Sequence, residues 1–204
     1  MQTFDVTKIT SAVDRALQTV DNPQHRHILK NYRRHALLEV SGYWEEILSP
    51  EMTVEEPLYR ITERGKTLVL DGMTEVRNFY RSITETGDNV FGALEEEVAV
   101  SDHGLFIDAT FAQVVRGSHD SVKDQGLDHD KVYQVSHKFA GVWPYRGGRL
   151  YGEFIYEDAE AWWIDEVDES SLISGAEARE LLAPLLAESP VEEIFEGLKL
   201  FANN

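Results

Sequence analysis

The chain contains no cysteine, few prolines and no long apolar stretch. Its 204 residues include 6 prolines. Because the chain has no cysteine, disulfide bonds, zinc–thiolate centres and cysteine nucleophiles are excluded. No uninterrupted apolar run approaches the roughly 18 residues of a membrane-spanning helix. The N-terminal MQTFDVTKIT lacks the basic and apolar regions of a secretory signal. We therefore expect a cytoplasmic protein with no membrane partner.

Basic residues are also scarce. Lys and Arg number 19 against 37 Asp and Glu, so the formal net charge is −18. A field of this sign repels phosphate backbones, and we expect no nucleic-acid partner. The one basic cluster lies at Arg26, Lys30, Arg33 and Arg34. Its charges are interpreted as a solvated helix face.

Aromatic residues are present in numbers that suit a folded core, with 9 Phe, 8 Tyr and 4 Trp.

The first part of the chain shows helical periodicity. Apolar residues recur every three or four positions over 4–20, 24–40 and 73–84, and a short helix is expected at 43–48. Residues 52–61 resemble a strand interrupted by Pro57.

From residue 89 the apolar period changes to two. This pattern predicts strands at 90–100, 104–116, 131–143 and 149–160, with a long polar loop at 117–130. Helices followed by long antiparallel strands indicate an α+β fold in which helices pack on one face of a curved, cone-shaped sheet.

The C-terminal part returns to helical patterning. Ser174 with Glu177 and Ser189 with Glu192 have the spacing of capping boxes. We divide the chain into an N-terminal helical extension (1–23), an α+β cone domain (24–165) and a C-terminal helical extension (166–204).

Three short motifs resemble the nuclear-transport-factor-two-like superfamily, which includes SnoaL-like polyketide cyclases and ketosteroid isomerases. They are TVEEP at 53–57, DGMTEVRNFY at 71–80, and GRL at 148–150 leading to Glu153 and Phe154. The resemblance covers roughly residues 24–160. It implies a cone-shaped antiparallel sheet packed against helices, and a pocket within the cone.

The resemblance also implies site residues. In ketosteroid isomerases the acid before the strand proline is the general base, which places Glu56 in that role. The oxyanion-hole tyrosine matches Tyr32, whereas the position of the third group is Gly141 and carries no acid. Limonene-epoxide hydrolase is another relative. Thr110 and Ala112 stand where its Arg and second Asp would be needed, although Glu153 matches one acid.

Two histidines add candidates for acid–base chemistry near neutral pH. His35 follows Tyr32 by three residues on one helix face, and His137 shares a strand face with Phe139. Scytalone dehydratase-type relatives use histidines in this way. The predicted catalytic residues are thus Glu56, Tyr32, His137 and His35, and the predicted substrate-binding residues are Phe139, Trp143, Asp108 and Glu153.

Three functions fit these observations. The first is a cofactor-independent lyase or isomerase acting on a small apolar carbonyl or hydroxyl compound. The second is a non-catalytic ligand-binding or dimerisation module of the same fold. The third is a metal-dependent enzyme using the loop that holds His119, Asp120, Asp124 and Asp128–Asp130; a solvated loop or a lid over the cone is the alternative there. We expect no cofactor and no metal, and we expect a homodimer formed through the exposed sheet face.

Overall fold

Helices open the chain. The structure is a computed structural model that describes residues 2–202. A 3-10 turn, η1 (Val6–Lys8), leads to α1 (Ser11–Thr19), α2 (Pro23–Val40) and α3 (Trp44–Ile47). The Asn22 side chain accepts the N–H groups of Gln24 and His25, which fixes the start of α2. The helices predicted at 24–40 and 43–48 are confirmed, whereas the one predicted at 4–20 divides into η1 and α1.

Seven strands form one sheet. They follow the order β2-β1-β7-β5-β4-β3, and the short β6 pairs with β5. The strands are β1 (Leu58–Glu63), β2 (Lys66–Asp71), β3 (Phe91–Ser101), β4 (Gly104–Arg116), β5 (Val132–Arg146), β6 (Arg149–Leu150) and β7 (Phe154–Val167). β1 runs parallel to β7, and the other pairs are antiparallel.

The sheet differs from the prediction in two places. The strand expected at 52–61 begins only at Leu58, and β2 was not predicted. The strand expected at 149–160 is divided into β6 and β7, because Gly152 lies against the backbone of β1. A Cβ at Gly152 would be 1.7 Å from the Leu58 carbonyl oxygen, so the chain bends here to bring the two backbones together.

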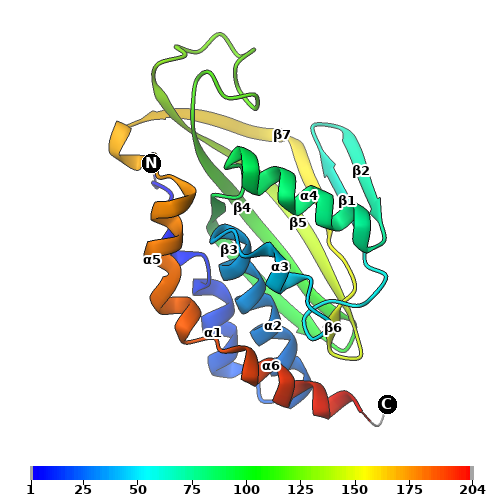
Figure 1. Ribbon diagram of the computed structural model, residues 1–204. Coiled ribbons are helices and arrows are strands. Elements are labelled where there is room, and N and C mark those ends of the chain that lie inside the picture. Colours follow the sequence, from blue (N-terminus) through cyan, green and yellow to red (C-terminus); the bar gives the residue numbers. More distant parts are fainter. Residues whose placement is uncertain (1, 203–204) are drawn as a thin grey trace.

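Helices cover the concave face of the sheet, which confirms the predicted α+β architecture (Figure 1). α4 (Met73–Thr86) lies across the sheet, with α2 and α3 beside it. The main core fills the space between them and includes the fully buried Leu29, Tyr59, Val76, Tyr80 and Leu105. No helix within residues 2–202 combines the length and apolarity needed to cross a membrane.

The C-terminal segment wraps around α2. It comprises η2 (Glu169–Ser171), α5 (Gly175–Ala187), α6 (Val191–Leu198) and η3 (Lys199–Phe201). The capping box of Ser174 and Glu177 is confirmed. The box predicted at Ser189 is wrong, since Pro190 is the N-cap of α6 and has no side-chain oxygen to accept a hydrogen bond.

The helical extensions share the core of the cone. Val13 of α1 and Ile194 of α6 belong to the same buried cluster as the sheet residues. The basic cluster contributes to this packing, because Arg33 and Arg34 are only 8% and 6% exposed. Both donate to backbone carbonyls of the C-terminal segment, Arg33 to Leu185 and Arg34 to Ser189. Their interpretation as a solvated face is therefore wrong.

Candidate functional site

Five polar side chains meet inside the cone, between α2, α4 and the sheet. His35 and Glu39 come from α2, where their spacing of four residues places them on one helix face. Tyr80 comes from α4, Tyr59 from β1, and Glu153 from the link before β7. We call this group the acid–histidine cluster. All of its members except Glu39 are buried.

Backbone pairing turns Glu153 into the interior. The N–H of Leu58 donates to the Tyr151 carbonyl, and the N–H of Arg60 donates to the carbonyl of Glu153 itself. Glycine at 152 permits this close approach of the two chains. The parallel β1–β7 pairing begins at this point, with Arg60 opposite Phe154. The Glu153 side chain therefore lies beside Tyr80 on the concave face.

A single imidazole nitrogen lies among several oxygens of the cluster. The Tyr80 hydroxyl donates to Oε1 of Glu153 at 2.7 Å, and Nε2 of His35 lies 3.2 Å from the same oxygen. The Tyr80 oxygen is also 3.1 Å from His35 Nε2 and 3.1 Å from the Tyr59 hydroxyl. Oε2 of Glu39 is 3.4 Å from His35 Nε2. These distances allow a proton to be shared between carboxylate, phenol and imidazole.

Burial changes the acidity of both partners. The side chains of His35 and Glu153 are 3% and 10% exposed. Desolvation raises the pKa of Glu153 to about 7, although the neighbouring His35 cation acts in the opposite direction. Burial alone would lower the pKa of His35, but its hydrogen bond to Glu39 and the charges of Glu153 and Glu39 raise it overall. The pair therefore changes its protonation near neutral pH.

The other ring nitrogen of His35 identifies the tautomer. Nδ1 is enclosed and has no hydrogen-bond partner among the described residues. An enclosed bare acceptor is tolerated more often than an enclosed N–H without an acceptor. We therefore assign the proton of neutral His35 to Nε2, where it faces Glu153, Glu39 and the Tyr80 oxygen.

Tyr32 lies in a separate acid pair. Its hydroxyl donates to Oε1 of Glu96 on β3 at 2.8 Å, and its ring meets Trp143 edge-on at 5.5 Å. Burial raises the pKa of Tyr32 well above its usual range, so the phenol stays protonated. Burial also raises the pKa of Glu96, which the hydrogen bond from Tyr32 partly opposes. The predicted oxyanion donor is thus already bonded to a carboxylate.

His137 lies in a row of stacked rings at the far end of the concave face. Its imidazole is sandwiched between Phe111 at 4.7 Å and Trp162 at 5.0 Å, and Phe139 lies next to it at 6.4 Å. A register shift between β5 and β7 after His137 aligns it with Trp162. Burial lowers the pKa of His137, so the ring is neutral at physiological pH. The predicted catalytic histidine therefore lies among aromatic rings, outside the acid–histidine cluster.

The structure corrects the expected positions of two acids. Glu56 is exposed, and its Oε2 lies at the surface beside Gly72. It lies in an irregular segment before β1, where strand alternation does not turn one of two neighbouring side chains inward. Asp108 is also exposed, because the buried Ile107 and Ala109 take the inward positions on β4. Neither acid joins the cluster.

The other predicted residues lie on the inner side. Trp143 is buried in the main core, and Phe139 is partly exposed against it. Further partly buried apolar side chains from α4 and β7 border the same core, among them Phe79, Ile83 and Ile155. Apolar side chains, some of them partly buried, therefore surround the acid–histidine cluster on the concave face.

The acid–histidine cluster and the Tyr32–Glu96 pair contain four residues that the sequence does not predict: Tyr59, Tyr80, Glu39 and Glu96. Tyr80 lies in the helix predicted at 73–84, and a hydroxyl on a buried helix face needs a hydrogen-bond partner, which could have indicated the contact. Glu39 follows His35 by four residues, and this spacing on a helix could have indicated the contact. Glu96 has no comparable signal, because it is the middle one of three consecutive glutamates.

Two hollows lie away from the cluster. One, of about 610 Å³, lies between the N-terminal segment and the edge of the sheet near Arg15, Glu95 and Lys138. The other, of about 450 Å³, lies between α2 and α6 beside His27. Across residues 2–202, no three His, Asp or Glu side chains are grouped so that they could hold a metal ion.

The similarity of this chain to known proteins lies in its fold. No protein-family model matches the chain, and no curated protein matches it. Bal32a, from a soil-derived mobile gene cassette, is similar with a TM-score of 0.50 and 15% identity, over 68% of this chain and 95% of Bal32a. An NTF2-like protein from Anabaena variabilis has a TM-score of 0.48 and 13% identity, over 68% and 92% of the two chains.

A phenazine biosynthesis-related protein from Pseudomonas aeruginosa has a TM-score of 0.41 and 9% identity, over 76% and 83% of the two chains. At such identities a likeness extends to the fold and not to the activity. The curved sheet of seven strands, the helices on its concave face and the match to Bal32a agree with one another. The chain therefore has the predicted α+β fold, with helices on the concave face of a curved sheet, and it shares this fold with Bal32a.

Proposed function

We propose that the protein is a cofactor-independent lyase or isomerase that moves a proton on a small, largely apolar carbonyl or hydroxyl compound. The observation that carries the proposal is the Glu153 carboxyl, which has a pKa of about 7 and lies within 3.2 Å of His35. A general acid–base group works best when its pKa lies near the operating pH. Glu153 therefore replaces Glu56 as the proposed base.

The neighbouring groups support this role. Ionised Glu153 would accept a proton from a carbon next to a carbonyl, and the Tyr80 hydroxyl is its hydrogen-bond donor at 2.7 Å. Nε2 of His35 faces the same carboxylate and would compensate the charge as the proton moves. Glu39 in turn faces His35 at 3.4 Å and favours its cationic form. Protonated Glu153 would then return the proton to the product.

The substrate class follows from the surroundings. Phe79, Phe139 and Ile155 are partly exposed beside the buried core, and they offer an apolar surface to a small molecule. An anionic substrate would be repelled by a protein with a net charge of −18 and two carboxylates at the site. A neutral ketone, enone or hydroxyketone fits this environment better than an anion does.

Proton exchange in heavy water tests the proposal directly, because exchange reports the proton transfer itself and needs no particular product. The protein is incubated in D₂O with a panel of small cyclic ketones and β-hydroxyketones, and NMR follows deuterium uptake at the carbon next to the carbonyl. We expect catalysed exchange with at least one compound, and its loss by about a hundredfold or more in E153Q. E56Q is the matched control and should retain full activity, because Glu56 is exposed.

A non-catalytic module is the second candidate. It is favoured by one observation: the hydroxyls of Tyr59 and Tyr80 are both satisfied within the acid–histidine cluster, which can therefore serve a purely structural purpose. Full exchange activity in E153Q would refute the role of Glu153. Absence of exchange with every compound, together with saturable binding of one of them, would favour the ligand-binding module.

A further inference from the structure

The loop between β4 and β5 lies at the end of the sheet where β4 finishes and β5 begins. We call residues 117–131 the strap. Its base is closed, because the N–H of Gly117 donates to the Lys131 carbonyl at 2.9 Å. A Cβ at Gly117 would lie 2.1 Å from the carbonyl oxygen of Asp128, so glycine is needed for this closure. Loops of this length without regular structure are uncommon in compact domains and often carry function. Figure 1 shows the strap projecting beyond the helices.

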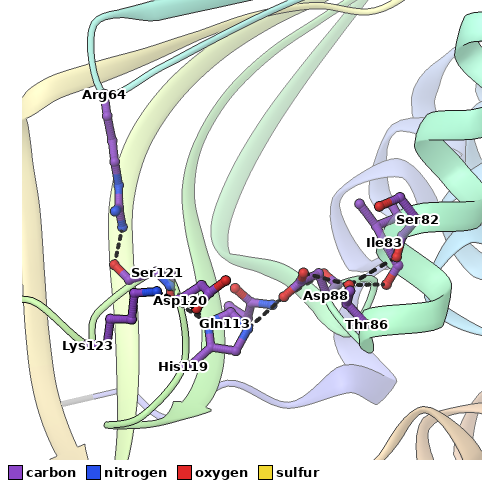
Figure 2. Close-up of polar contacts among 10 residues, drawn as sticks. All are labelled: Arg64, Ser82, Ile83, Thr86, Asp88, Gln113, His119, Asp120, Ser121 and Lys123. Atoms are coloured by element: carbon purple, nitrogen blue, oxygen red, sulfur yellow. Dashed lines mark hydrogen bonds and ion pairs between the residues drawn. The ribbon is translucent and has the colours of Figure 1, made fainter.

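Two side-chain anchors attach the strap to opposite rims of the cone (Figure 2). Arg64, in the turn between β1 and β2, donates to the Ser121 carbonyl at 2.6 Å. On the other side, Nε2 of His119 lies 2.7 Å from Oδ1 of Asp88, between α4 and β3. The second oxygen of Asp88 accepts the Thr86 hydroxyl at 2.7 Å. The strap thus bridges two elements that are separate from its own hairpin.

The ring nitrogens of His119 have defined roles. The N–H of Ser121 donates to Nδ1 at 3.2 Å, so Nδ1 is an acceptor in neutral His119. Nε2 then carries the proton and donates to Asp88. The contact is directional, yet the side chains of His119 and Asp88 remain 29% and 35% exposed. Partly exposed contacts of this kind contribute little free energy each, and they can open without unfolding the sheet.

The strap covers apolar side chains of the concave face. Val122 is 1% exposed and packs against Val115 and Val135, with Trp162 at the margin of the same cluster. The guanidinium of Arg64 lies 4.3 Å from the centre of the Trp162 ring. Arg64 therefore both hydrogen-bonds to the strap and packs on the Trp162 ring. Release of the anchors would expose this apolar surface.

We propose that the strap is a lid that controls the entry of an apolar molecule to the concave face, with the His119–Asp88 contact as its latch. This proposal rests on the proposed function only in that the molecule admitted would react at Glu153. Opening releases Val122 from the sheet and uncovers Trp162 and His137. Closing returns Arg64 and His119 to their partners and screens the interior from water.

Crosslinking tests the lid in the intact chain. The variant D88C/H119C removes the latch, and a short bismaleimide then restores a tether at the same place. The reaction is specific because the chain contains no other cysteine. Stopped-flow fluorescence measures the association of the neutral dye Nile red before and after crosslinking. We expect the crosslinked protein to bind the dye about tenfold more slowly than the same protein without the tether.

A matched control uses the exposed ion pair of Glu196 and Lys199 in the C-terminal segment. Crosslinked E196C/K199C should bind Nile red at an unchanged rate. Equal rates for D88C/H119C before and after crosslinking would overturn the lid. The two proposals fail separately, because proton exchange tests Glu153 and the dye-binding rates before and after crosslinking test the latch.

Discussion

Nε2 of His35 lies 3.2 Å from Oε1 of Glu153, and neither side chain is more than 10% exposed. Two ionisable groups so close together titrate as a pair, and the pair carries a proton that both can hold near neutral pH. α2 supplies the imidazole and the link before β7 supplies the carboxylate, from positions far apart in the sequence. The folded chain therefore assembles this contact, and it affects both stability and the proposed chemistry.

Stability should depend on pH through Glu153. The pKa of this carboxyl is about 7 in the folded protein, whereas the ordinary value for a glutamate is 4.5. Between these values the folded state binds more protons than the unfolded state, so the free energy of unfolding falls as pH rises. The raised pKa of His35 acts with the same sign. E153Q has no such proton to lose. Between pH 5 and pH 8, its free energy of unfolding should therefore rise by about 2 to 3 kcal/mol relative to that of the wild type.

Urea unfolding at pH 5 and pH 8 measures this difference. E56Q serves as the control and should follow the wild type at both pH values, since Glu56 is at the surface. A difference between E153Q and wild type that is the same at both pH values would show that the carboxyl is not perturbed by burial.

The hydroxyl of Tyr80 should contribute more to the free energy of unfolding than the hydroxyl of Tyr59 does. Tyr80 contacts Glu153, His35 and Tyr59, whereas the Tyr59 hydroxyl hydrogen-bonds to Tyr80 at 3.1 Å. Y80F leaves a buried carboxylate without its donor, so we expect a loss of about 1 to 3 kcal/mol in unfolding free energy. Y59F should cost about 1 kcal/mol or less. Chemical denaturation of the two variants at one pH compares them, and a larger loss in Y59F would contradict the arrangement.

The C-terminal segment should depend on Arg34. This side chain donates to the Ser189 carbonyl and pairs with Glu46 at 2.6 Å. R34M leaves the carbonyl without its donor and should reduce the free energy of unfolding by about 1 to 3 kcal/mol. K30M is the matched control, because Lys30 is 34% exposed in its pair with Glu193 and such a pair contributes about 0 to 1 kcal/mol. Equal losses in the two variants would argue against the buried role of Arg34.

Gly197 should be irreplaceable at the contact between α6 and α2. A Cβ there would lie 1.9 Å from Nδ1 of the buried His27, whose Nε2 is bonded to the Gly148 carbonyl at 2.7 Å. G197A should therefore destabilise the protein by about 1 to 3 kcal/mol. At Gly175 an added Cβ meets nothing within 4 Å, so G175A should be neutral or slightly stabilising. Thermal unfolding of both variants tests the contrast.

The outer face of the sheet is the proposed dimer contact. Phe106, Val142 and Phe154 lie opposite one another on β4, β5 and β7, and Tyr156 beside them is 51% exposed. Such a row is a typical association surface. Light scattering should find a dimer at micromolar concentration and a monomer for F106E/Y156E. L181E changes an equally exposed apolar residue of α5 and should leave the dimer intact.

Local patterns were sufficient for much of the fold. The period of 3.6 in α2 and α4, the period of two in β3, β4 and β5, and the Ser174–Glu177 spacing each depend on neighbours within a few residues. β2 was missed because its KTLVLD segment is short and mostly exposed, so it shows little alternation. The motif at 71–80 combines a turn glycine with an amphipathic helix, and α4 follows this glycine in the structure.

The site itself depended on contacts between distant residues. The resemblance implied Glu56 as the general base, whereas the backbone of the folded chain places Glu153, and not Glu56, in the interior. Gly152 lets β1 approach and brings Glu153 to Tyr80, whereas the irregular segment before Pro57 leaves Glu56 in water. Burial and partner distance fix a carboxyl's pKa, and both arise from residues far apart in the chain. Composition and periodicity thus determined the architecture, and long-range packing selected the acid.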